Sequence, residues 1–149
     1  MDDIGFVLII VLVVLIFISA FFSGSETSIT AINQIKLDSA AENGEKSAKR
    51  VNSLRNKIDE VLGVILIGNN LVNISASALL TYFVIKRFGD EYVWVGTLVL
   101  TVLIIIFAEI APKNFAAKKP EAIAYPASIV LQFLTNYFGW LSRILNFFS

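Results

Sequence analysis

Three uncharged apolar stretches, over residues 4–22, 61–85 and 93–108, dominate the sequence. At about 1.5 Å per residue, a helix of roughly 20 apolar residues crosses the hydrocarbon core of a bilayer. Inside that core every backbone polar group needs an internal partner, which an α-helix supplies within one segment. The sequence therefore predicts an all-α membrane protein with three transmembrane helices.

Charged segments of unequal length separate the three stretches. We expect transmembrane helices over about 4–32, 60–86 and 92–115, and juxtamembrane helices over about 36–57 and 121–148. The first helix carries Asp2 and Asp3 where a signal peptide carries basic residues, so we interpret it as a retained span. Asn43-Gly44 divides the first juxtamembrane segment, which predicts a pair of short helices there.

The last segment, 124–148, is apolar enough to be considered as a fourth crossing. Its polar residues recur every three or four positions, which places them in one stripe of a helix whose other face is aromatic and aliphatic. The stripe comprises Ser128, Gln132, Thr135, Asn136, Gly139, Ser142, Arg143 and Asn146. This pattern favours an amphipathic helix at the membrane interface over a fourth span.

Lysine and arginine are distributed unevenly around the predicted spans. Ten of the twelve lie in the 36–57 segment or near and beyond the end of the third span, and only Lys86 and Arg87 lie on the opposite side. Cytoplasmic segments of membrane proteins are enriched in these residues. We therefore expect a multi-pass protein of the plasma membrane, with its N-terminus outside, its C-terminus in the cytoplasm and the juxtamembrane helices on the cytoplasmic side.

Several classes of function are excluded by what the sequence lacks. It has no cysteine, no histidine and a formal net charge of zero. Thiolate or imidazole metal sites, cysteine nucleophiles and histidine bases therefore cannot form, and nothing indicates a nucleic-acid partner. Neither a lysine nor a second carboxylate is expected at membrane depth to build an intramembrane protease, so we do not expect an enzyme. A metal ion held here must be a hard cation bound through oxygen.

Polar residues interrupt the first and second spans, where they are unfavourable without partners. Ser19 and Ser23 are four residues apart in the first span, so their hydroxyls share a face. In the second span Asn70 and Asn73 share a face, and Asn69 points away from them. Structural alternatives remain open, because serine can bond to its own helix and amides can join helices to one another.

The third span ends in Glu109-Ile110-Ala111-Pro112-Lys113. Glu109 can pair with Lys113 one helical turn away, or it can face the bundle interior as an ionisable functional group. Because proline lacks a backbone donor, we expect Pro112 to kink or end the helix and to free carbonyl groups for a cation.

Hydroxyls, amides and one carboxylate from three helices form an all-oxygen set. The predicted ligands are Ser19, Ser23, Asn70, Asn73 and Glu109. Such a set suits Mg²⁺, Ca²⁺ or Na⁺ and excludes soft metals. Since only one formal charge is present, a divalent ion would be held weakly, as a transported ion must be.

The polar motifs resemble the signatures of one family of membrane proteins. Ser23-Gly24-Ser25-Glu26-Thr27, Gly68-Asn69-Asn70 with Asn73, and Glu109-Ile110-Ala111-Pro112-Lys113 are similar to motifs of the CorC/cyclin-M (CNNM) magnesium transporters. The resemblance covers essentially the whole chain, as that family's transmembrane domain. It implies a homodimer in the lipid bilayer that transports Mg²⁺, by export coupled to Na⁺, with the five predicted ligands around a dehydrated ion.

Members of that family continue into cytosolic CBS domains that bind ATP, and we expect none within these 149 residues and hence no nucleotide binding. The leading hypothesis is Na⁺-coupled Mg²⁺ export through an all-oxygen site between the three spans. The alternative is a membrane anchor and dimerisation module that senses Mg²⁺ for a cytosolic regulatory domain.

Overall fold

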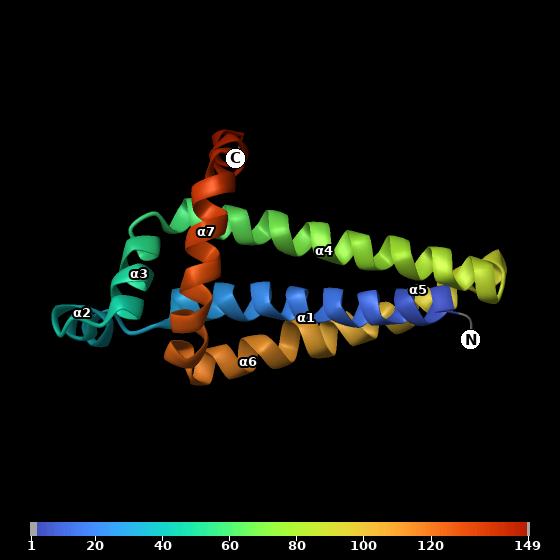
Figure 1. Cartoon of the computed structure of the whole chain (residues 1–149), viewed down its shortest axis with the longest axis horizontal. Helices are drawn as coiled ribbons and strands as arrows, with labels where there is room; N and C mark the ends of the chain where they lie inside the picture. The colour runs from blue at the N-terminus through green and yellow to red at the C-terminus, as the bar shows by residue number, and fades with distance from the viewer. Residues whose placement is uncertain (1–2, 149) are drawn as a thin grey trace.

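Helices make up nearly all of the structure (Figure 1). The computed structural model describes residues 3–148, and no strand occurs among them. The elements are α1 (Asp3–Ala31), α2 (Gln34–Glu42), α3 (Lys46–Arg55), α4 (Ile58–Arg87), the 3₁₀ turn η1 (Asp90–Tyr92), α5 (Val93–Leu103), the π-helical segment η2 (Ile104–Ile110), α6 (Ala111–Lys118) and α7 (Pro120–Phe147). The predicted all-α class is confirmed.

Three helical runs are long and apolar enough to cross a membrane: Asp3–Ala31, Ile58–Arg87 and Asp90–Lys118. α4 contacts the third run through η1 and α5 but, within the described chain, not through η2 or α6. There α1 lies between them and contacts both sides (Figure 1). α4 and the third run thus meet at the α4–α5 turn, and α1 separates them at the opposite end.

The short helices α2 and α3 follow α1 and are held by capping contacts. Asn33 Oδ1 accepts hydrogen bonds from the backbone N–H groups of Ile35 and Lys36, which satisfies donors at the start of α2. Gly44 adopts a φ of 90° between the two helices, a conformation that favours glycine. Arg55 at the end of α3 donates to the backbone carbonyl of Ile29 at 2.9 Å, within the last turn of α1.

α7 runs across the other helices instead of alongside them (Figure 1), so it does not cross a membrane in the same direction as the three spans. Part of its polar stripe packs against the protein, because Ser128, Thr135, Gly139 and Ser142 are buried. Ser142 Oγ donates to the carbonyl of Glu60 at 2.8 Å, and Arg143 forms an ion pair with the Glu60 carboxylate. The aromatic face of α7 is exposed, as for a helix that lies at an interface.

The third run differs from the sequence prediction at Pro112. We expected a kink or an end there, but the helix continues to Lys118 and the irregularity precedes the proline. Over η2 the bonding widens, and the N–H of Ala111 donates to the carbonyl five residues earlier, on Ile106. Because Pro112 cannot donate to the carbonyl of Ala108, a change of hydrogen-bond register before it is the physical reason for the difference.

Candidate cation site

The two serines of α1 bond to different neighbouring helices. Both side chains are fully buried. Ser19 Oγ donates to Oδ1 of Asn69 on α4 at 2.9 Å, and Ser23 Oγ donates to Oε1 of Glu109 on η2 at 3.3 Å. By contrast, the hydroxyl of Thr30 donates to carbonyls of its own helix. Ser19 and Ser23 therefore join α1 to both neighbours.

Glu109 makes both of the contacts that its sequence position suggested. Its Oε1 faces Ser23, and its Oε2 lies 3.0 Å from Nζ of Lys113, one turn further along. The Glu109 side chain is 30% exposed and that of Lys113 is 42% exposed. The carboxylate lies in the π-helical segment, a geometry that is frequent at functional sites. It is thus reachable from outside the bundle and neutralised by lysine.

The asparagines of α4 are arranged differently from the expectation. Asn69, which we expected to point away, is the amide that bonds to α1. Asn73 is half-buried and Asn70 is exposed. Neither forms a side-chain hydrogen bond with any residue of the range 3–148. The structure thus brings together Ser19 with Asn69 and Ser23 with Glu109, and it leaves Asn70 and Asn73 outside these bonds.

The sequence contained a weak indication that Asn69 faces the protein. Ile65 and Ala76, four residues before and seven after it, are apolar, and both are buried in the structure. These positions share a helix face with Asn69. The signal is weak because residues that face lipid in a span are apolar too, so apolar spacing does not separate the protein-facing side from the lipid-facing side.

Glycines of two motifs allow close approach to α1. A Cβ on Gly68 would lie 2.5 Å from Cζ of Phe22, so the ring occupies the space beside the asparagines. Gly24 faces Pro112, and a Cβ there would lie 3.6 Å from the proline Cβ. The motif that begins at Ser23 therefore packs directly on the motif that contains Glu109.

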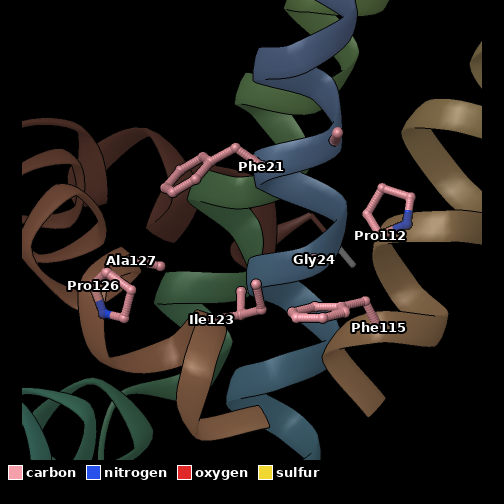
Figure 2. Close-up of a pocket in the computed structure, with 8 residues that line it drawn as sticks. Phe21, Gly24, Pro112, Phe115, Ile123, Pro126 and Ala127 are labelled. Atoms are coloured by element: carbon pink, nitrogen blue, oxygen red, sulfur yellow. The ribbon is translucent and has the colours of Figure 1, made fainter. Parts of the chain in front are cut away.

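Figure 2 shows a cavity of about 370 Å³ beside Gly24, between α1, α6 and α7. Phe21, Phe115 and Ile123 are among the apolar side chains that line it. None of its lining residues carries a polar side chain. Its side chains offer no ligand for a cation.

A second cavity, of about 560 Å³, lies near the ends of α1 and α4 that adjoin the juxtamembrane helices. Glu26, three residues after Ser23, and Asp59 both line it. Their carboxylates give this cavity a negative charge. Within the described chain no three Asp or Glu residues are grouped closely enough to form a carboxylate metal centre. The candidate oxygen ligands that bond across helices thus form two separate pairs, Ser19 with Asn69 on α4 and Ser23 with Glu109 on η2.

Residues 10–149 match the family model of the cyclin M transmembrane N-terminal domain, CNNM. The chain belongs to this family. It is 47% identical over 132 residues to the UPF0053 inner membrane protein YfjD of Escherichia coli K12, which covers 87% of this chain and 31% of that protein. It is 40% identical over 142 residues to a UPF0053 protein of Haemophilus influenzae. That alignment covers 95% of this chain and 34% of the relative.

A more distant relative is the metal transporter cnnm-4 of Caenorhabditis elegans, 34% identical over 118 residues, with 76% of this chain and 25% of that protein covered. The chain thus spans about a third of the length of the two bacterial relatives. The predicted resemblance to the CNNM family is confirmed.

Proposed function

We propose that this chain is the transmembrane domain of a divalent cation transporter that moves Mg²⁺ between α1, α4 and η2. The observation that carries the proposal is the pair of buried hydroxyls on α1 that reach an amide and a carboxylate on the two neighbouring runs. Hard cations prefer such oxygen groups. Membership of the CNNM family and similarity to a relative named as a metal transporter support transport and not catalysis.

The proposed ligands are Ser19, Ser23, Asn70, Asn73 and Glu109, and the position of Asn69 adds it as a candidate. Mg²⁺ takes six oxygens at about 2.0–2.1 Å and gives up water reluctantly. A dehydrated ion therefore requires the hydrogen bonds of Ser19 and Ser23 to be exchanged for contacts with the ion. Pro112 has no N–H group to donate to the carbonyl of Ala108. That carbonyl oxygen is therefore a further candidate ligand near Glu109.

Lys113 keeps the carboxylate of Glu109 paired when no ion is bound. Its ammonium group lies 3.0 Å from Oε2. An unpaired charge in a low-dielectric site is unfavourable, so an arriving cation exchanges with Lys113 and is exchanged again on release. The negative cavity at Glu26 and Asp59 is the proposed entrance, because like-charged clefts concentrate counter-ions.

We propose that transport is export coupled to Na⁺ entry. Moving one charge through 100 mV is worth about 2.3 kcal/mol, so expelling a divalent ion against an inside-negative potential costs about twice that. Entry of Na⁺ offsets that cost. The proposed orientation, with the C-terminus in the cytoplasm of a multi-pass plasma-membrane protein, rests on the uneven lysine and arginine distribution. The relative YfjD is named as an inner membrane protein.

A second copy of the chain is proposed to cover the face of α4 that carries Asn70, because an exposed amide is unfavourable in hydrocarbon. Ile74, one turn later, is 68% exposed. The chain has no cysteine, so Ile74→Cys introduces one reactive thiol, and oxidation in liposomes should give a covalent dimer. The matched Phe17→Cys variant, on the exposed face of α1, should stay monomeric. Equal cross-linking of the two variants would contradict this interface.

The alternative function is a membrane anchor and dimerisation module that senses Mg²⁺ for a cytosolic regulatory domain. The ion pair between Glu109 and Lys113 is the observation that favours it, because a neutralised carboxylate can serve helix packing alone. It predicts that Glu109→Gln alters stability without altering ion flux.

Mg²⁺ flux in liposomes, with and without an opposing Na⁺ gradient, tests the proposal. We expect Glu109→Ala to lower the Na⁺-dependent flux about a hundredfold, because loss of the only carboxylate removes about 3 kcal/mol of ion stabilisation. The Glu91→Gln variant, at the opposite end of the third run, is the control and should transport normally. Unchanged flux in Glu109→Ala, with Mg²⁺ still raising the melting temperature, would refute the proposed site.

A further inference from the structure

A third cavity, of about 290 Å³, lies at the other end of the spans, between the first turns of α1 and the last turns of α4. Ile4, Leu8 and Phe83 supply apolar walls. Lys86 and Arg87 also line it, and both side chains are exposed. An apolar slot with two cations at its rim is a different chemistry from that of the cation site, which is formed from acceptor oxygens.

Lys86 and Arg87 lie apart from the other lysines and arginines of the chain. The other ten lysines and arginines lie in or near the juxtamembrane helices or at the far end of the third run. Neither Lys86 nor Arg87 forms an ion pair with any described residue, although Asp90 and Glu91 follow closely in the chain. The Lys86 ammonium lies over the ring of Tyr82, 5.7 Å from its centroid. Two cations therefore line one cavity, and none of its described lining residues is an aspartate or glutamate.

The depth of the cavity indicates the kind of ligand. It lies where α1 begins and α4 ends, which for membrane-spanning helices is the boundary between hydrocarbon and headgroups. A phospholipid presents a phosphate at that boundary and an acyl chain below it. Arginine binds phosphate oxygens through two parallel N–H groups, and lysine adds a point charge. The phosphate of such a lipid thus matches the two cations at the rim, and its acyl chain matches the apolar walls.

We propose that this cavity binds one phospholipid, with its phosphate at Lys86 and Arg87 and an acyl chain against Ile4, Leu8 and Phe83. Cations in the last turn of a helix also interact favourably with its carbonyl end, but that interaction requires no apolar cavity beside them. The bound lipid would hold the start of α1 against the end of α4, where the described contacts include no hydrogen bond or ion pair between side chains of these two segments. The proposal does not depend on the transported ion.

Lipid binding by the purified 149-residue chain, measured by native mass spectrometry in detergent, tests the proposal. The probe is palmitoyl-oleoyl phosphatidylglycerol, and the comparison lipid is the diacylglycerol with the same chains and no phosphate. We expect the phospholipid to be retained and the diacylglycerol to be lost. Excess inorganic phosphate should not displace the phospholipid, because it cannot fill the apolar slot.

Two variants separate this site from general attraction between cations and lipids. Lys86→Gln combined with Arg87→Gln should lower the affinity for the phospholipid about a hundredfold, since each of the two charge-assisted contacts is worth roughly tenfold. The pair Lys118→Gln and Lys119→Gln, also adjacent in sequence, is the matched control and should bind normally. Leu8→Trp fills the slot and keeps the cations, and it should weaken binding as well.

Each opposite result would overturn the proposal. Normal binding by the Lys86/Arg87 double variant would exclude the cations. Normal binding by Leu8→Trp would exclude the cavity and leave surface electrostatics. Equal retention of diacylglycerol, or displacement by inorganic phosphate, would exclude a phospholipid that uses both parts of the site. Melting temperatures in the same detergent verify that every variant is folded.

Discussion

The two halves of α1 have different surroundings although they form one helix. In the first half, residues 3–18, the buried residues are Gly5 and Leu12, and large apolar side chains such as Phe17 are exposed. In the second half, 19–31, four serines are buried between α4, the third run and α7. In a membrane the exposed side chains of the first half would face lipid, which requires only that they be apolar. The second half packs against protein, and its small polar side chains permit close contacts and bonds between helices.

The largest difference between the halves should appear when a buried residue is enlarged. Ser28 is fully buried, so Ser28→Leu should overpack the second half and destabilise the protein by about 1–3 kcal/mol. Val14 is 48% exposed in the first half, and Val14→Leu should change stability by less than about 0.5 kcal/mol. Thermal unfolding in detergent measures both. Equal destabilisation would show that the first half is also enclosed, for example by another chain.

A smaller effect should come from the hydrogen bond between Ser19 and Asn69. A double-mutant cycle with Ser19→Ala and Asn69→Ala should give a coupling of about 0.6 kcal/mol, the typical value for such bonds between membrane helices. The same cycle with Asn70→Ala in place of Asn69→Ala should give no coupling. Coupling to Asn70 instead would place the interhelical bond on the other asparagine.

The smallest effect should come from Glu26, at the charged end of the second half. Glu26→Gln leaves the buried serines in place, so the melting temperature should not change. Loss of one exposed charge at the entrance should slow Mg²⁺ flux about twofold at low salt and less at high salt, because exposed charges are screened. Flux measured at two ionic strengths tests this, and a salt-independent decrease would place Glu26 in direct contact with the ion.

The positions of the spans were predictable from sequence, because an uninterrupted apolar stretch of sufficient length has few alternatives to a membrane helix. The polar motifs were also visible, since Asn69, Glu109 and the serines stand out in apolar surroundings. Their rotational placement was not predictable. The choice between Asn69 and Asn70 depends on which side of α4 meets α1, and apolar residues cover both the protein-facing and the lipid-facing sides.

The effect of Pro112 was predictable only in part. Its missing donor implies an irregularity nearby, but whether the chain bends, ends or changes hydrogen-bond register depends on tertiary packing, which here includes the approach of Gly24 to Pro112. The stripe of α7 shows the same limit. Its periodicity indicated an amphipathic helix, yet burial of Ser142 beside Gly63 arises from a tertiary crossing that periodicity does not encode.

The crossing of α7 over α4 gives the molecule a mechanical connection. A Cβ on Gly63 would overlap with Ser142, so the two helices touch without space to slide. Asn69 lies six residues further along α4, about 9 Å by the helical rise, and the helix is unbroken between them. A push or twist applied to α7 would therefore be carried as a rigid displacement to the amide that bonds Ser19.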